Sequence, residues 1–188
     1  NAVRRPVAVA ALTFVFALSG KLLLKDKLVR SGKWNDRTNH MGYGLTNKIL
    51  GVIGCGSIGS EFIKLSSRFF RKTISYDPYL TENYIKQKGA VKVELLALAK
   101  ESDFVVILCN LNEETKGLID KRFLNSMKKK SFLINMSRGA VVKENDLIYA
   151  LENDKINGAG LDVMNDEPIS MKNKLLSLNN VILTPHAL

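Results

Sequence analysis

Short hydrophobic runs separated by amphipathic segments fill the chain from residue 48 onward. Residues 49–53 form an apolar run that is rich in β-branched side chains and bounded by glycine, which is typical of a buried parallel strand. Apolar residues at helical spacing then predict a helix over 61–70, and residues 72–77 predict a second strand that ends in an acid. The order of strand, glycine turn, helix, strand and acid is that of a dinucleotide-binding unit.

The same alternation continues to the end of the sequence. Further strands are predicted over 90–93, 103–108, 131–135, 157–163 and 181–183, and helical segments over 81–88, 94–100, 120–127 and 144–152. We therefore expect an α/β fold of the Rossmann type, in which a doubly wound parallel sheet carries helices on both faces. Ligands of such sheets bind at the carboxyl ends of the strands.

The N-terminal segment follows a helical pattern. Pro6 suits the first turn of a helix and Gly32 lies just past its end, so we expect one long helix over 6–31. Its first half is apolar on all sides, which requires cover from another domain or subunit. A basic start and an apolar core also resemble a signal peptide or membrane anchor, but the apolar run is too short to span a bilayer. Residues 33–47 predict a loop, in which we assign no role to His40.

The glycine turn after the first strand has the spacing that a pyrophosphate site needs. Gly54 permits the tight turn, Gly56 lets a pyrophosphate approach the backbone, and Gly59 lets the helix pack closely on the sheet. Ser57 and Ile58 open the helix, so their amides and the positive end of the helix dipole face the phosphate oxygens. A plain strand-to-helix turn is the alternative interpretation.

Asp77 lies 18 residues beyond Gly59, at the end of the second predicted strand. A carboxylate there can accept both hydroxyls of the adenosine ribose and would repel a 2′-phosphate. The sequence therefore predicts NAD rather than NADP as the cofactor.

Composition narrows the class of protein. The chain has 188 residues, 46% of them hydrophobic, which suffices for one packed domain. The net charge is +10, but the lysines are scattered without aromatic interleaving, so we expect a solvated surface and no nucleic-acid or membrane partner. Cys55 and Cys109 end apolar strands and lack metal-ligand spacing, so we expect buried thiols, no metal, and a reducing compartment such as the cytoplasm.

Three later motifs, taken with the glycine turn, resemble a known family. They are LINMSRGAVVKENDLIYAL, which contains Ser137 to Gly139, GAGLDVMNDEP at 158–168, and NVILTPHA at 180–187. Their order closely resembles the nucleotide-binding domain of the D-isomer-specific 2-hydroxyacid dehydrogenases, including phosphoglycerate and glycerate/hydroxypyruvate enzymes. The resemblance covers essentially the whole chain. The opening helix is similar to the family's helix that joins two domains and contributes to a homodimer interface.

The resemblance implies roles for individual residues. Arg138, Glu167 and His186 match the catalytic positions, for which the chemistry is suitable. A guanidinium can hold the carboxylate and 2-oxo oxygen of a substrate, and an imidazole oriented by a carboxylate can take the hydroxyl proton. Asp162 matches the residue that contacts the nicotinamide carboxamide. The segments matching those that line the cofactor contain Cys109, Asn110, Met136 and Ser137.

The sequence also departs from the family pattern. Asn110 stands where relatives commonly have proline, and residues 69–71 replace the usual glycine before the second strand. Residues 1–47 are expected to be an interdomain and dimer element and 48–188 the NAD-binding domain, while the family's substrate domain is not in this chain. We therefore expect a fragment that binds NAD but turns over a 2-hydroxy acid poorly, because one wall of the cleft is missing. The alternative is an NAD-sensing scaffold, similar to the corepressors that resemble this family.

Overall fold

The computed structural model describes residues 2–187 and contains one parallel sheet with helices on both faces. The strands are β1 Ile49–Ile53, β2 Lys72–Tyr76, β3 Val91–Lys92, β4 Phe104–Ile107, β5 Phe132–Asn135, β6 Gly158–Leu161 and β7 Val181–Leu183. Their spatial order is β3-β2-β1-β4-β5-β6-β7, and every neighbouring pair is parallel. The order reverses between β1 and β4, which is where doubly wound sheets bind ligands. The expected fold class is confirmed.

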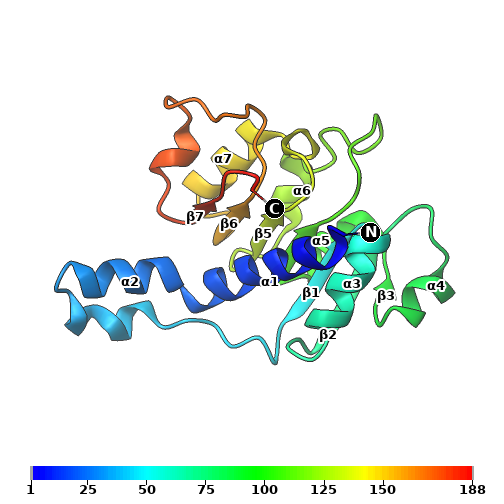
Figure 1. Ribbon diagram of the computed structural model, residues 1–188, viewed down its shortest axis with the longest axis horizontal. Coiled ribbons are helices and arrows are strands. Elements are labelled where there is room, and N and C mark those ends of the chain that lie inside the picture. The colour runs from blue at the N-terminus through cyan, green and yellow to red at the C-terminus, as the bar shows by residue number, and fades with distance from the viewer. Residues whose placement is uncertain (1, 188) are drawn as a thin grey trace.

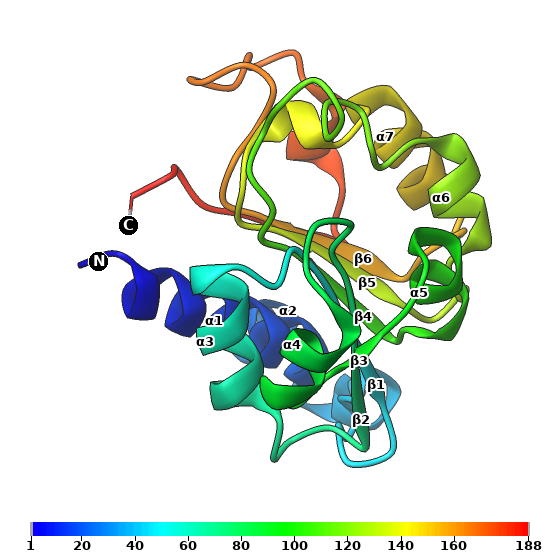
Figure 2. The ribbon, with the colours of Figure 1, turned by 90° about the vertical axis from the view of Figure 1, so that its right-hand side faces the viewer.

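The helices divide into two layers that bury alternate residues of the strands (Figure 2). One layer consists of α1 Arg4–Gly20, α3 Ser57–Ser66 and α4 Glu82–Gln87, and the other of α5 Leu95–Glu101, α6 Lys121–Ser126 and α7 Glu144–Glu152. In β4, Phe104 and Val106 join the core under the first layer, whereas Val105 and Ile107 join the core under the second. This alternation explains why every residue of β4 is apolar and buried.

The expected single helix over 6–31 is wrong, because the segment is two helices. Helix α1 ends at Gly20 and α2 Leu22–Arg30 begins after Lys21, with a bend of 55° between them. Lys21 adopts the left-handed conformation at φ 51°, and the carbonyl oxygen of Ser19 accepts the N–H of Tyr43 at 2.7 Å. A continuous helix would have needed that carbonyl for its own next turn, so the returning chain ends the helix there.

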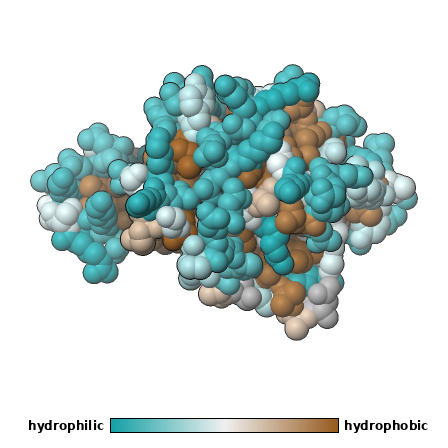
Figure 3. All heavy atoms as spheres, turned by 90° about the horizontal axis from the view of Figure 1, so that it is seen from above, coloured by the Kyte–Doolittle hydropathy of each residue, from teal (hydrophilic) through white to brown (hydrophobic). Residues whose placement is uncertain are grey.

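Helix α2 and the 3₁₀ helix η1 Trp34–His40 form an arm that projects from the body (Figure 1). No residue of either element is buried, and the arm is mostly hydrophilic with hydrophobic residues in between when seen from above (Figure 3). The η1 turn lies inside residues 33–47, which we expected to be loop throughout. Among residues 2–187, no single helix is long and apolar enough to cross a bilayer, and only the bent pair α1 and α2 passes that test together.

Smaller differences concern helix ends. Helix α3 begins at Ser57, as the glycine motif predicted, but it ends at Ser66 rather than at residue 70. The other expected elements match the observed ones to within a few residues, and two 3₁₀ turns, η2 Gly139–Val141 and η3 Lys174–Ser177, lie in the connections.

Polar contacts fix the two edges of this layered structure. Helix α1 is joined to α3 by Arg4 and Arg5, whose guanidinium groups lie 3.8 and 3.5 Å from the buried carboxylate of Glu61. At the amino ends of the strands, Asp103 accepts the N–H of Ile49 at 2.9 Å and pairs with two lysines. The lysines are Lys48 at 3.6 Å and Lys128 at 3.2 Å. The Asp103 contacts lie at the rim opposite the one that carries the predicted site.

Candidate functional site

The glycine turn after β1 has the geometry that the motif predicted. Gly54 has φ +91°, and a Cβ there would lie 2.6 Å from the amide nitrogen of Cys109. A Cβ at Gly59 would collide with the carbonyl oxygen of Gly54, so only glycine allows α3 to pack this closely. At Gly56 no atom lies within 4 Å of the Cβ position, and this glycine immediately precedes the first turn of α3. The open space and the helix start suit a bound pyrophosphate.

A cleft of about 400 Å³ opens beside this turn, between the carboxyl ends of β1, β2 and β4. Its lining contains Gly54, Gly56, Ser57, Ile58, Asp77, Cys109 and Asn110 from the predicted set, together with Ile53, Tyr76, Pro78, Tyr79, Leu108, Asn112, Glu114, Thr115 and Leu118. None of these lining residues is a lysine or an arginine.

Asp77 follows β2 and is buried at the edge of the cleft. One carboxylate oxygen accepts the N–H of Cys55 at 2.9 Å, and the other accepts the N–H of Tyr79 at 3.1 Å. The side chain is therefore held in one orientation by the backbone. Each oxygen has a second lone pair, which remains available for a ribose hydroxyl.

The two cysteines are free thiols at the ends of neighbouring strands. Cys55 is buried and Cys109 is half-buried in the cleft wall. Burial raises the pKa of Cys55 and raises the pKa of Cys109 to about 11, so both are neutral at physiological pH. Within residues 2–187, no group of three or more His, Cys, Asp or Glu side chains could hold a metal ion.

A second group of predicted residues lies after β5. The side chain of Asn135 accepts the N–H of Ser137 at 3.1 Å and donates to the carbonyl of Arg138 at 3.0 Å. The hydroxyl of Ser137 donates to the carbonyl of Cys109, which ties this segment to the end of β4. Met136 and Ser137 are buried, whereas Arg138 is exposed and its Nη1 donates to the carbonyl of Ser137 at 2.6 Å.

Asp162 is buried at the end of β6. Its N–H donates to the carbonyl of Asn135 at 3.1 Å, and its Oδ1 accepts the hydroxyl of Thr184 at 2.5 Å. The carboxyl ends of β5, β6 and β7 are thus joined by one chain of hydrogen bonds.

Glu167 and His186 form a direct pair, although 19 residues separate them. Glu167 Oε2 lies 2.8 Å from His186 Nδ1, and Glu167 Oε1 accepts the N–H of Met164 at 3.0 Å. The hydrogen bond with His186 is the largest cause that lowers the pKa of Glu167, and the Met164 amide and the charge of Arg138 lower it further. An ionised carboxylate only accepts, so the proton of this hydrogen bond is on Nδ1, and Nε2 is the ring nitrogen that Glu167 does not contact.

The structure therefore distributes the predicted residues over two adjoining regions of one rim. The glycine turn, Asp77, Cys109 and Asn110 line the cleft, while Arg138, Asp162, Glu167 and His186 belong to the loops after β5, β6 and β7. Sequence reasoning missed four residues with direct contacts to this rim, which are Tyr79, Glu114, Asn135 and Thr184. Asn135 and Thr184 lie within the motifs that we singled out, so their positions were the available signal.

The reversal point of a parallel sheet, a glycine turn opening a helix, and an acid on the next strand define a dinucleotide-binding α/β domain. The sequence model of the D-isomer specific 2-hydroxyacid dehydrogenase, NAD binding domain, matches residues 12–187, and the chain belongs to this family. The resemblance inferred from the sequence motifs is confirmed.

Individual relatives agree with this assignment. A glyoxylate reductase of Korarchaeum cryptofilum is 38% identical over 180 residues, which are 94% of this chain and 54% of that protein. A D-lactate dehydrogenase of Aquifex aeolicus, solved with NAD and lactic acid, has a TM-score of 0.88 and 32% identity over 96% of this chain and 58% of its own. An acyclic imino acid reductase solved with NADPH and D-Arg has a TM-score of 0.87 and 28% identity over 97% and 57%. The chain thus spans about half the length of these relatives.

Proposed function

We propose that this domain binds NAD(H) in the cleft beside the glycine turn, and that the whole protein transfers hydride between NAD(H) and a D-2-hydroxy acid/2-oxo acid pair. The single observation that carries the proposal is the Glu167–His186 pair at the rim that also holds the cleft. A scaffold without chemistry needs no such pair, and nothing in the comparisons favours the scaffold alternative. The small-molecule substrate would reach this rim from outside the sheet.

In this mechanism, the amides of the first turn of α3 bind the pyrophosphate and Asp77 binds the adenosine ribose. Bound NAD supplies the hydride acceptor, the nicotinamide ring. Asp162, kept in place by Thr184, orients the carboxamide of that ring. Backbone and side-chain groups at Cys109, Asn110, Met136 and Ser137 border the dinucleotide. These residue roles follow the match to the family motifs and the positions at the rim.

The chemical step needs three side chains. Arg138 swings from its present contact with the Ser137 carbonyl to hold the substrate carboxylate and the oxygen on C2. His186 Nε2 accepts the hydroxyl proton as C2 loses its hydride, and the product is the 2-oxo acid. Glu167 keeps the ring in the required tautomer and stabilises the imidazolium that forms.

The remainder of the protein would complete the site. Because the chain covers 54% of the glyoxylate reductase, we infer that a substrate domain outside these residues forms the other wall of the cleft. Residues 1–47 then join the two domains and 48–188 bind the cofactor. We expect the domain alone to bind NADH and to turn over poorly, since hydride transfer requires a closed, water-poor cleft.

We also infer that two copies associate through α1 and the arm. This segment exposes several large apolar side chains, namely Val9, Phe16, Leu22, Leu23 and Val29. Covering such a surface with a second copy would remove it from water. Sedimentation equilibrium of the chain and of a Leu23→Asp variant tests the dimer.

Free thiols at Cys55 and Cys109 suit a cytoplasmic protein.

The proposal is tested by titrating NADH into the 188-residue chain and by assaying the whole protein with hydroxypyruvate and glyoxylate. We expect NADH binding by the chain and reduction of at least one 2-oxo acid by the whole protein. In the whole protein, His186→Gln should abolish turnover and leave NADH affinity unchanged. A chain that shows no saturable NADH binding would overturn the cofactor assignment, and full turnover by the chain alone would overturn the need for a second domain.

A further inference from the structure

Two loops on opposite sides of the cleft are joined by side chains. Tyr79 lies in the connection between β2 and α4, and Glu114 lies in the connection between β4 and α6. The hydroxyl of Tyr79 donates a hydrogen bond to the carboxylate of Glu114, 35 residues further along the chain, and both residues line the cleft. The N–H of Tyr79 also donates to Asp77, so one residue contacts two acids.

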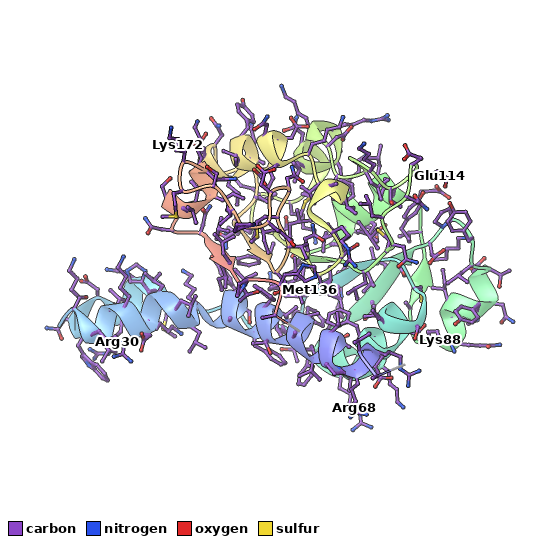
Figure 4. All side chains as sticks on the ribbon, turned by 45° about the horizontal axis from the view of Figure 1, so that its top comes forward. Arg30, Arg68, Lys88, Glu114, Met136 and Lys172 are labelled. Atoms are coloured by element: carbon purple, nitrogen blue, oxygen red, sulfur yellow. The ribbon has the colours of Figure 1, made fainter. Side chains whose placement is uncertain are left out.

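The loop that carries Glu114 is organised to hold this position. Asn112 Oδ1 accepts the N–H groups of Glu114 at 3.0 Å and of Thr115 at 2.9 Å. The hydroxyl of Thr115 donates to the carbonyl of Asn110 at 2.7 Å, which fastens the turn to the segment after β4. Figure 4 shows Glu114 at the end of the molecule remote from Arg30 in the arm. The carboxylate is therefore presented by a structured turn rather than by a free loop.

The charges around this end of the cleft are unbalanced. Asp77 and Glu114 are both carboxylates in the lining, while none of the described lining residues is a cation. Two lysines near this end contact groups outside the cleft lining: Lys92 Nζ donates to the carbonyl of Leu80 at 2.6 Å, and Lys88 Nζ lies 4.7 Å from the centroid of the Tyr84 ring. The pKa of Tyr76, another lining residue, is raised by burial and then by several acids that include Glu114 and Asp77. The negative charges of Glu114 and Asp77 are therefore both felt at Tyr76 in the cleft wall.

We propose that Glu114, held by Tyr79, is a second acid that discriminates against a 2′-phosphorylated dinucleotide, and that the bond between the two side chains closes the ribose end of the cleft. This inference rests on the proposed cofactor site and goes beyond the role of Asp77. A 2′-phosphate on the ribose bound at Asp77 would bring two negative charges into the field of both carboxylates. The hydroxyls of NAD carry no charge and would not experience that repulsion.

Two conservative variants test the charge of Glu114 and its hydrogen bond with Tyr79 separately. Glu114→Gln removes the charge but keeps an oxygen that can accept from Tyr79, whereas Tyr79→Phe keeps the ring and removes the hydrogen bond. Glu113→Gln is the matched control, because it removes the same charge one residue earlier in the same loop, at a position outside the cleft lining. All three positions are exposed, so the fold should be retained, and circular dichroism checks this.

The measurements are fluorescence titrations of NADH and NADPH into the 188-residue chain, and stopped-flow release of NADH. We expect Glu114→Gln to tighten NADPH binding roughly 5-fold at low salt, with NADH affinity unchanged within about twofold. The gain should shrink at high ionic strength, because exposed charges are screened. Tyr79→Phe should accelerate NADH release about threefold, since one hydrogen bond across the cleft is lost. Glu113→Gln should change none of these quantities.

The outcomes distinguish this inference from the function on which it rests. If the unaltered chain binds no NADH, the cofactor site and the inference fail together. If NADH binds normally but Glu114→Gln gives the same NADPH affinity as Glu113→Gln, the inference fails and the cofactor site stands. A gain for Glu114→Gln that persists in high salt would show a steric rather than a charge effect and would equally overturn it.

Discussion

The carboxylate of Asp77 accepts the N–H of Cys55 over 2.9 Å, so the acid that follows β2 is bonded directly to the glycine turn that follows β1. The residue expected to bind the ribose also fixes the loop expected to bind the pyrophosphate. Substitutions of Asp77 must therefore distinguish its expected binding of the ribose from its hydrogen bond to the glycine turn.

We therefore predict different results for Asp77→Asn and Asp77→Ala. Asparagine keeps an oxygen for the buried Cys55 amide and loses only the acceptor of the Tyr79 N–H, so most of the stability should be retained while NAD binding weakens and discrimination against NADP relaxes. Alanine leaves that donor without its partner, which should cost about 1–3 kcal/mol of unfolding free energy in addition. Urea denaturation and cofactor titration of both variants provide the measurement. Unchanged affinities for NAD and NADP in Asp77→Asn would contradict the ribose assignment.

The Glu167–His186 pair predicts a shifted acid titration. The hydrogen bond with His186 is the largest cause of the lowered pKa of Glu167, so replacing His186 by Gln should move this pKa back toward the ordinary value for glutamate. Because the folded-state pKa is the lower one, the pair stabilises the fold above the unfolded-state pKa. That contribution is lost as pH falls through the lowered value. The side-chain carbonyl shift of Glu167, followed by carbon NMR from pH 7 to pH 2, measures both midpoints. Identical midpoints in the two proteins would show that the pair does not persist in solution.

Asn135 is predicted to position Arg138 without touching substrate. Asn135→Asp keeps the acceptor for the Ser137 N–H but replaces the donor to the Arg138 carbonyl by a repelling oxygen. In the whole protein we expect kcat to fall roughly 100-fold through misplacement of the guanidinium, with NADH affinity changed less than about threefold.

Asn153→Asp serves as the control for Asn135→Asp, since that exposed side chain donates to Tyr149 far from this rim. Wild-type kcat in Asn135→Asp would refute the positioning role. An equal loss of NADH binding and kcat would instead indicate a general disturbance of the rim.

At the opposite rim, Asp103 is predicted to act on stability alone. Asp103→Ala removes the acceptor of the Ile49 N–H and the partner of Lys48 and Lys128. We expect a loss of about 1–3 kcal/mol in unfolding free energy with unchanged NADH affinity. Chemical denaturation and titration of the same preparation test this, and a weakened cofactor affinity at 25 °C would contradict the separation of the two rims.

Local sequence signals were sufficient for the sheet and the glycine turn, because a buried parallel strand must be apolar throughout and a close backbone approach must be glycine. They failed at Lys21, where the apolar helical pattern continues unbroken. The helix ends there because Tyr43, more than twenty residues later, bonds to the carbonyl of Ser19. The pairing of Tyr79 with Glu114 was equally out of reach, since it joins two loops that only the strand order brings together.

Because Lys21 is left-handed, the arm leaves the end of α1 at an angle instead of continuing along its axis. Tyr43 holds this junction, since its N–H donates to the carbonyl of Ser19 and its ring lies 5.3 Å from the ammonium group of Lys21. Helix α1 packs in turn along α3, whose first turn borders the cleft. The arm is thus connected to the glycine turn through two helices packed side by side, so its orientation relative to the cleft is set by the contacts at Lys21 and between α1 and α3.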